Sequence, residues 1–480
     1  MLLKALVFAS ALPSLQLAGM MDAAESSFVV DAELGLVLLS KDSNSERQVA
    51  SLTKVATTVV ALKWLHVNEV SWDAEDRFRE TVLLLNSGWE ERSRLESAGD
   101  PVTNRRLLSP AKYVSMRCMR IGLLNSGGDC PGLNAVTHGV VGAATQLGWE
   151  VYGFKQGYEG LLSPGDYKVL QVEKTEGILK VGGTILGSSN KGHFVSKVGA
   201  GGVRAIPTKL MDEAVATMKG LGVEALICVG GDGSLSTAQQ LYEHGFPVVG
   251  VPKTIDNDLA ATAMTFGFDS ACHSVVDALD RLQTTAESHK RVMVLEVMGR
   301  HAGWIALYGG MGGGACSILI PEIPFDLNNV AKTIRHRDKN GFYHSLVVVA
   351  EGAAPIGGTQ LYEETKEDGE SRLGGIGEQV AKQLSALTGK ETRCTTLGHL
   401  QRGGSPTALD RVLGTRFGVK AVKLIEEKRF GRMVSYQQYH VGSVSIKEAV
   451  RELNLVDPEG EVVEAAKSVG ISFGAVSYTH

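Results

Sequence analysis

The chain has few cysteines, and they show no pairing pattern. Its 480 residues include six cysteines, and no two of them form a C-x-x-C pair. Such scattered cysteines favour free thiols in a reducing compartment over disulfides or a zinc site. Neither charge is in large excess, with 48 basic against 53 acidic residues. We therefore expect a cytoplasmic protein that has no nucleic-acid partner and no stable membrane association.

Long uncharged apolar runs are also absent beyond the first residues, so the sequence predicts no transmembrane helix. Residues Met1–Ala24 differ from the rest. Lys4 is followed by an apolar run that extends to Met20, and small residues close the segment. This pattern is typical of a secretory signal peptide, which conflicts with the expected cytoplasmic location. An apolar start without significance is the alternative interpretation.

Glycine, in contrast, is abundant, and the 57 glycines cluster where predicted strands end. In the clearest case an apolar strand over 225–229 leads into Gly230-Gly231-Asp232-Gly233-Ser234 and then a helix. A strand that feeds a glycine-rich turn into a helix N-terminus is an anion site, because backbone N–H groups and the helix dipole both favour phosphate. Asp232 adds a hard oxygen ligand for Mg²⁺.

A second chemically loaded turn follows the next predicted strand, 248–251. It carries Lys253, Thr254, Asp256 and Asp258, which place a cation, a hydroxyl and two carboxylates in one short loop. An Asx-type turn without chemical function is the structural alternative. Two such turns at successive strand ends favour phosphoryl transfer, which needs positioning, charge neutralisation and a base for the attacking hydroxyl.

Six motifs support this interpretation: SGGDCPGLNA, GGTILGS, GGDGS, PKTIDND, EVMGRHAGW and GHLQRGGSP. They occur in the order found in 6-phosphofructokinases, and the chain from about Met119 to Gly474 resembles that family. The resemblance implies an α/β fold of two similar Rossmann-like lobes with mostly parallel sheets, preceded by an N-terminal fragment of uncertain fold. Apolar runs that alternate with helical stretches agree with such a fold. We expect strands at 225–229, 248–251, 291–297, 345–350 and 395–398.

The resemblance also implies a division of the chain. The expected parts are a leader (1–24), a segment related to another family (25–115), a donor-binding lobe (116–256, with part of the C-terminal tail), a fructose 6-phosphate lobe (257–430) and a C-terminal segment (431–480).

Individual residues acquire roles from the same resemblance. Asp256 matches the family's base and Asp258 its helper, and Asp232 is the candidate Mg²⁺ ligand. The other implied catalytic residues are Lys253, Thr254 and Arg300. The implied donor-binding residues are Gly127, Asn190, Lys191, Asp232, Gly233 and Ser234. The implied substrate-binding residues are Thr254, Arg291, Met298, Gly299, Arg300, Glu351, Arg393, His399 and Arg402.

Two of these arginines imply self-association. Guanidinium groups suit a sugar phosphate because they bind it bidentately. Arg291 and Arg393 correspond to family residues that reach in from a neighbouring subunit, so we expect a homodimer or homotetramer. One departure concerns the donor side, where the family commonly has an arginine and this chain has Asn190 and Lys191. A non-catalytic sugar-phosphate sensor is therefore an alternative to an enzyme.

The phosphoryl donor is ATP or pyrophosphate, and two residues point in different directions. Gly233 leaves open the path of a nucleotide's α-phosphate, whereas pyrophosphate-dependent relatives have an aspartate there. Lys253 is a residue that pyrophosphate users carry, although some ATP users combine it with the same glycine. A blocked path excludes a nucleotide, whereas an added cation stabilises either donor. The sequence thus predicts ATP, with pyrophosphate as the alternative.

The segment before the phosphofructokinase-like part resembles a different family. Ser51 and Lys54 lie three residues apart on one predicted helical face, as a serine nucleophile and its lysine base would. Residues 27–65 resemble the start of serine-type D-Ala-D-Ala carboxypeptidases. That family also needs a K-T-G, which this chain lacks, and the nearby S-x-N at 188–190 belongs to another motif. We expect 25–115 to be truncated and catalytically silent; a secreted penicillin-binding hydrolase is the alternative.

Overall fold

The computed structural model describes residues 27–30, 37–41, 119–189, 191–195, 197–198, 202–365 and 371–475. The chain divides into two units, Met1–Tyr113 and Val114–His480. In the first unit the described residues form β1 (Ser27–Val30) and β2 (Val37–Lys41), which pair in antiparallel fashion. The leader-like segment, the Ser51–Lys54 pair and Asn190 lie outside the described residues.

The first lobe of the second unit is built on a seven-stranded sheet. Its strands are β3 (Arg120–Asn125), β4 (Glu150–Phe154), β5 (Tyr167–Leu170), β8 (Val223–Gly230), β9 (Val248–Pro252), β16 (Arg432–Gln437) and β17 (His440–Ser445). Their order is β17-β16-β9-β8-β3-β4-β5. The strands from β16 to β4 are parallel neighbours, and β5 and β17 add antiparallel edges.

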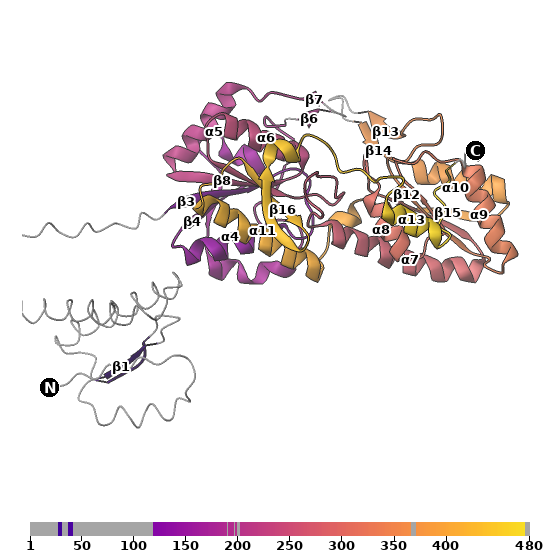
Figure 1. Cartoon of the computed structure of the whole chain (residues 1–480), viewed down its shortest axis with the longest axis horizontal. Helices are drawn as coiled ribbons and strands as arrows, with labels where there is room; N and C mark the ends of the chain where they lie inside the picture. The colour runs from indigo at the N-terminus through magenta and orange to yellow at the C-terminus, as the bar shows by residue number, and fades with distance from the viewer. Residues whose placement is uncertain are drawn as a thin grey trace, which may run out of the picture. The chain divides into compact units, whose positions relative to one another are not determined.

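Helices cover both faces of this sheet (Figure 1). The helices are α4 (Leu133–Gln146), α5 (Thr208–Gly220), α6 (Asp232–Glu243), α11 (Ala408–Glu426) and the short α12 (Ile446–Ala449). Buried side chains of α4 and α11 share one core with the sheet, and those of α5, α6 and α12 share another. Glycines let α4 and α11 cross closely, since a Cβ at Gly139 would lie 2.3 Å from the Thr415 carbonyl oxygen.

The second lobe has a smaller, parallel sheet in the order β11-β12-β10-β15. Its strands are β10 (Val292–Val297), β11 (Ser317–Leu319), β12 (Ser345–Ala350) and β15 (Thr392–Thr396). Its helices are α7 (Phe268–His289), α8 (Trp304–Gly312), α9 (Leu327–Lys339) and α10 (Ile376–Thr388). Side chains of α7 and α8 extend the core of α4 and α11, whereas α9 and α10 enclose a separate core.

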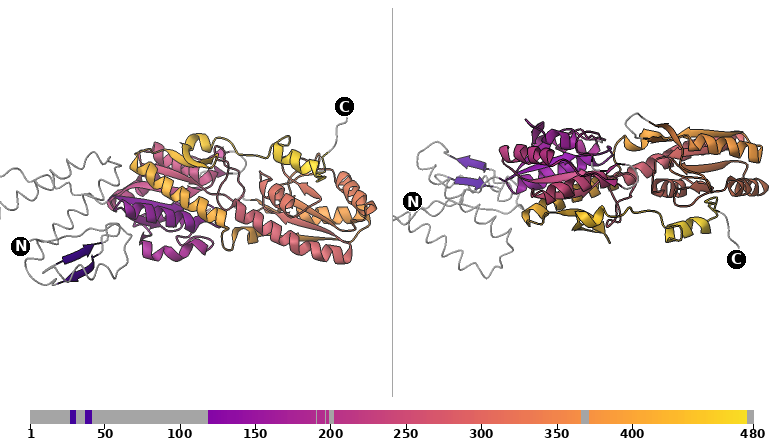
Figure 2. Two further views of the ribbon diagram at one scale, coloured as in Figure 1. Left: turned by 60° about the horizontal axis from the view of Figure 1, so that its bottom comes forward. Right: turned by 90° about the horizontal axis from the view of Figure 1, so that it is seen from above.

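The C-terminal segment contacts both lobes, as the yellow elements in the two views of Figure 2 show. After β16, β17 and α12 it continues to α13 (Glu461–Ser468), and the Ile318 amide then donates to the Ser472 carbonyl oxygen at 2.9 Å. The remaining short elements are η2 (Gly157–Leu161), η3 (Val172–Lys174), η4 (Glu176–Lys180), β6 (Lys197–Val198), β7 (Gly202–Val203), β13 (Tyr362–Thr365), β14 (Ser371–Leu373) and η5 (Gly398–Arg402).

The architecture confirms the predicted α/β class with mostly parallel sheets. The strand expected at 395–398 is wrong, because β15 covers Thr392–Thr396 and the following residues form a 3₁₀ turn. This strand lies at the edge of its sheet and is partly exposed, so it lacks the continuous apolar run of a central strand. No helix in the described ranges has both the length and the apolar character needed to cross a bilayer.

Candidate active site

The carboxyl ends of β3 and β8 carry the two glycine turns, and these turns face each other. Gly127, with φ +84°, bends the first turn; a Cβ there would lie 3.2 Å from Ser234 Oγ and 3.3 Å from Lys253 Nζ. Because Gly127 has no side chain, the first turn can approach the second turn closely. The α6 helix begins at Asp232, directly after β8, so its N-terminus and dipole point into the space between the turns.

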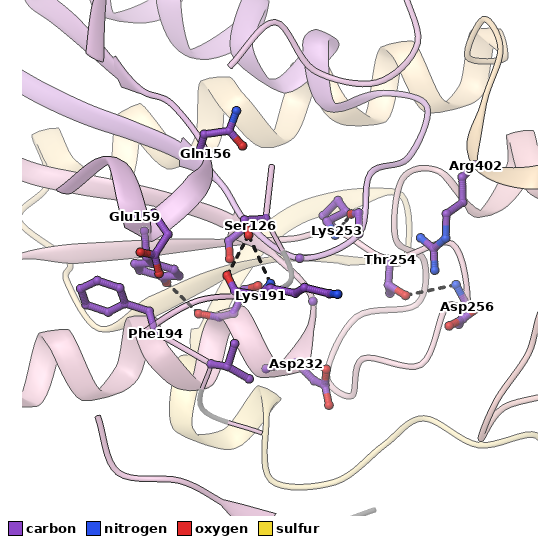
Figure 3. A pocket seen from close by; sticks show the side chains of 18 of the residues that line it. Ser126, Gln156, Glu159, Lys191, Phe194, Asp232, Lys253, Thr254, Asp256 and Arg402 are labelled. Carbon is purple, nitrogen blue, oxygen red and sulfur yellow. Dashed lines mark hydrogen bonds between the residues drawn. The ribbon is translucent and has the colours of Figure 1, made fainter. Parts of the chain in front are cut away.

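These turns line a cavity of about 270 Å³ (Figure 3). It brings together many residues that the sequence had singled out: Gly127, Lys191, Asp232, Gly233, Ser234, Lys253, Thr254, Asp256, Asp258 and Arg402. The first lobe supplies all of them except Arg402, which follows β15 in the second lobe. The cavity therefore combines hydrogen-bond donors, cations and carboxylates.

Asp256 is the most unusual carboxylate of this cavity. One of its oxygens, Oδ1, is buried and has no hydrogen-bond partner in the described structure. Burial raises the pKa of Asp256 to about 6, and the nearby Arg402 guanidinium opposes that rise. A carboxylate with a vacant acceptor and a pKa close to neutral has the properties of a general base.

Asp258 lies two residues further along the same loop. Burial raises its pKa to about 7, and the negative charges of Asp256 and Asp232 contribute to the rise. The three carboxylates are thus close enough to repel one another. Cationic groups or a bound cation would relieve this repulsion, which is a property expected where Mg²⁺ and phosphates bind.

Local hydrogen bonds hold the loop that carries these carboxylates. The Asp256 amide donates to Thr254 Oγ1 at 3.1 Å, and Thr265 Oγ1 donates to the Thr254 carbonyl oxygen at 2.7 Å. Asn257 adopts the left-handed conformation, with φ +52°, and its Oδ1 accepts from the Thr265 amide at 2.9 Å. The loop therefore has one defined conformation in which Asp256 and Asp258 flank a buried asparagine.

Lys253 and Arg402 supply positive charge to the cavity. Lys253 is only 3% exposed, and its ammonium group donates to the Gly128 carbonyl oxygen. Burial lowers its pKa. Arg402 donates from Nη1 to the Asp129 carbonyl oxygen at 3.0 Å, and Figure 3 shows its guanidinium directed toward Thr254 and Asp256. A side chain at Gly128 would clash with Arg402, because a Cβ there would lie 2.9 Å from Nη1.

The predicted sugar contacts follow β10 and β12 in the second lobe. Met298, Gly299 and Arg300 come directly after β10, and Glu351 comes directly after β12. The two loops are joined, since the Gly352 amide donates to the Gly299 carbonyl oxygen at 3.1 Å. Burial raises the pKa of Glu351, and the charge of Arg300 opposes this. The charges of Glu351 and Arg300 both influence the pKa of Asp256, so these two side chains lie close to the candidate base.

The structure does not bring every predicted residue to this cavity. Arg291 and Arg393 lie at the amino ends of β10 and β15, and parallel strands rise about 3.3 Å per residue. At that rise Arg291 lies roughly 20 Å from the carboxyl end of β10, and Arg393 lies roughly 10 Å from the carboxyl end of β15. Both contact Glu391, with nitrogen–oxygen distances of 2.8 and 2.7 Å. His399 is exposed and lines a different hollow, together with Ser274 and Leu400.

Several residues of the site carried no signal in the sequence. Gln401 is fully buried; its Oε1 accepts from the Met298 amide at 3.3 Å, and its Nε2 donates to the Gly398 carbonyl oxygen at 3.0 Å. Tyr158 and Phe194 stack with ring centroids 5.6 Å apart and line the donor cavity. Their positions depend on tertiary packing, and a single sequence offers no spacing rule that would have selected them.

Fold and cavity together define a two-lobed α/β protein with two facing glycine turns beside a candidate base. A family model described as phosphofructokinase matches residues 120–425, and the chain belongs to this family. An ATP-dependent 6-phosphofructokinase of Chloroflexus aurantiacus is 51% identical over 361 residues, which are 75% of this chain and 99% of the relative. A pyrophosphate–fructose 6-phosphate 1-phosphotransferase of Amycolatopsis methanolica is 49% identical over 344 residues, which are 71% of this chain and 97% of the relative.

Solved structures agree with this assignment. The structure of phosphofructokinase from Saccharomyces cerevisiae matches with a TM-score of 0.61 at 30% identity. The match covers 69% of this chain and 45% of the yeast chain, so this chain spans less than half of the yeast chain's length. A pyrophosphate-dependent phosphofructokinase from Marinobacter aquaeolei shares the fold, with a TM-score of 0.60 at 20% identity over 74% of this chain and 92% of that one.

Proposed function

We propose that the protein is an ATP-dependent 6-phosphofructokinase. It transfers the terminal phosphoryl group of ATP to the 1-hydroxyl of D-fructose 6-phosphate, which yields fructose 1,6-bisphosphate and ADP. The observation that carries the proposal is the buried, unpartnered Oδ1 of Asp256, which lies in one cavity with the phosphate-binding turn of α6. Family membership and the named relatives support the same reaction.

We propose a task for each group of the site. The N-terminus of α6 and Lys253 hold the donor phosphates, while Arg300, Glu351 and Met298 hold the sugar. Asp256 accepts the proton of the sugar's 1-hydroxyl. The hydroxyl oxygen bonds to the transferring phosphorus while the bond from that phosphorus to ADP breaks. Arg402 lines the same cavity near Asp256, and its proposed role is to stabilise the negative charge that develops between donor and acceptor in the transition state.

Magnesium fits this site through Asp232. Mg²⁺ is usually held in proteins by one or two carboxylates together with phosphate oxygens and water, so a single aspartate at the phosphate turn is a sufficient protein contribution. The described residues contain no cluster of three or more His, Cys, Asp or Glu side chains that would hold a metal without the donor. When bound, Mg²⁺ would neutralise phosphate charge next to Asp232.

ATP is the favoured donor because apolar side chains line part of the cavity. Gln156, Tyr158, Phe194 and Val195 belong to its lining, which includes two aromatic rings and an aliphatic side chain. Pyrophosphate has no group that would use such a surface, whereas a nucleotide base would pack against it. The proposal is tested by measuring fructose 1,6-bisphosphate formation by the full chain. Turnover with neither ATP nor pyrophosphate would refute it.

Self-association follows from the positions of Arg291 and Arg393. Within one chain these guanidiniums lie at the wrong ends of β10 and β15 to reach the chain's own sugar site. We propose that they serve the site of a second copy, in a homodimer or homotetramer. Light scattering on the purified protein tests this, and an active monomer would contradict it.

Catalysis should depend on pH through Asp256. Its raised pKa means that the base becomes protonated as the pH falls through about 6, so kcat/KM should be maximal above neutral pH and decline below it. The fold should not be lost in parallel, because a carboxylate with a raised pKa binds protons more tightly in the folded state than in the unfolded state. A pH profile by ³¹P NMR, with thermal unfolding at each pH, checks this. An acid limb near pH 4 would contradict the assignment.

For the N-terminal segment we propose that it is catalytically silent and that the protein acts in the cytoplasm. The matched family region starts at residue 120, so the segment is not part of the phosphofructokinase match. A fluorescent β-lactam should not label the full chain. Labelling that Ser51→Ala abolishes would establish a penicillin-binding activity instead. Cell fractionation tests the location, and cleavage after Ala24 with periplasmic activity would contradict it.

A further inference from the structure

The C-terminal segment contains a residue, Asn454, that contacts the catalytic loop directly. It lies beyond the family match, which ends at residue 425. Its backbone amide donates to the Asp258 carbonyl oxygen at 2.9 Å, and its side-chain Nδ2 donates to the Asn257 carbonyl oxygen at 2.9 Å. The preceding Leu453 pairs with Leu259 in an isolated antiparallel bridge. The segment therefore holds the main-chain carbonyls of Asn257 and Asp258, the two residues that follow the candidate base.

These two carbonyl groups determine the direction of the loop. Asn257 has a left-handed backbone, which an asparagine adopts at some cost and which its neighbours must maintain. The Asn257 side chain is already bonded to Thr265, so it is Asn454 that satisfies the Asn257 main-chain carbonyl. This peptide group joins Asn257 to Asp258, so its rotation would move Asp258 directly and Asp256 through Asn257.

On its other side, the same segment is bonded to the loop that carries Arg300. The carbonyl oxygen of Asn454 accepts from Trp304 Nε1 at 2.7 Å. Two residues later the Val456 amide donates to Glu322 Oε1 at 2.8 Å, and this carboxylate also accepts from the Gly303 amide at 2.9 Å. Gly303 and Trp304 lie at the start of α8, only three and four residues after Arg300.

We propose that Asn454 is a positioning residue that sets the distance between the base of the first lobe and the acceptor arginine of the second lobe. It acts through Asn257 on Asp256 and through Trp304 on Arg300, and it touches neither substrate. This inference rests on the proposed function, because Asp256 and Arg300 have their roles in that reaction. Small misplacements of reacting groups reduce rates strongly, so the effect should appear in kcat.

Asn454→Ala tests the proposal, because it removes one hydrogen bond to the loop and leaves the main-chain bonds of residue 454 in place. We expect kcat to fall about tenfold or more, with the KM values for both substrates changed by less than about threefold. The matched control is Asn329→Ala. Asn329 Nδ2 also donates to a main-chain oxygen of the C-terminal segment, that of Ala475, at 2.9 Å, but far along the chain from the loop. This variant should keep wild-type kcat.

Trp304→Phe provides a second variant that keeps an aromatic ring and removes only the indole donor. It should lower kcat as well, and the double variant should lose less than the product of the two single effects, because both act through one segment. The proposal would be overturned if Asn454→Ala and Asn329→Ala had equal kcat and both had a lower melting temperature. Asn454 would then contribute only to the stability of the fold.

Hydrogen exchange separates this inference from the proposed function. Backbone amides of residues 254–259 should exchange faster in Asn454→Ala than in Asn329→Ala, whether or not the wild type phosphorylates fructose 6-phosphate. Unchanged exchange in this loop would overturn the positioning role. A wild type without this activity, but with loop exchange that depends on Asn454, would instead refute the proposed function alone.

Discussion

Asp256→Ala is expected to lower kcat by two to four orders of magnitude while fructose 6-phosphate still binds. General-base catalysis contributes about 10²–10⁴-fold to such reactions, and this carboxylate has the unpartnered buried oxygen that a substrate hydroxyl would fill. In the proposed site the sugar is held by the loops after β10 and β12, which the substitution leaves in place. Binding measured by calorimetry without a donor, and kcat measured with saturating substrates, give the two quantities.

Asp410 offers a matched control for this experiment. Like Asp256 it has a buried, unpartnered Oδ1, and burial raises its pKa to about 6 as well. Its Oδ2 accepts from the Ser270 amide and hydroxyl at 2.8 and 2.6 Å, so it ties α11 to α7 outside the donor cavity. Asp256→Asn and Asp410→Asn make the same chemical change. Only the first should reduce kcat by orders of magnitude, and similar losses in both would argue against a base role.

Gly233→Asp should suppress ATP use far more than pyrophosphate use. Gly233 is the second residue of α6 and lines the donor cavity, so an aspartate there would fill the path of the α-phosphate and repel it. The fold should tolerate the change, because acidic residues in the first turn of a helix interact favourably with its dipole. The measurement is kcat/KM with each donor for the wild type and the variant.

Gly233→Ala separates volume from charge in this experiment, since it adds a Cβ without a carboxylate. It should reduce ATP use less than the aspartate does. A wild type that prefers pyrophosphate tenfold, about 1.4 kcal/mol of transition-state binding, would overturn the choice of ATP. In that case Lys253, buried in the same cavity, would be the residue that decides the donor.

Local chain chemistry made much of the donor side predictable. An apolar strand, a glycine turn and a helix start are neighbours in sequence, so β8 and the start of α6 follow from a short stretch of residues. The loop after β9 could be recognised for the same reason, because Lys253, Thr254, Asp256 and Asp258 lie within six positions. Parallel strands bring both turns to one edge of the sheet. The sequence by itself therefore determined that the glycine turns and the carboxylates of the candidate site meet.

Only the tertiary structure decided how distant segments complete that site. Arg402 enters the donor cavity from the second lobe, whereas His399, three residues earlier, faces another hollow. Asn454 contacts the loop of the candidate base although it lies 197 positions from Asn257, its hydrogen-bond partner. Such contacts depend on how whole helices and strands pack. Hydrophobic burial drives this packing, and because it is non-directional it does not specify from a local pattern which distant residues will meet. No spacing in the sequence encodes them, so the turns and carboxylates of the candidate site were predictable, and their completion by the second lobe and the C-terminal segment was not.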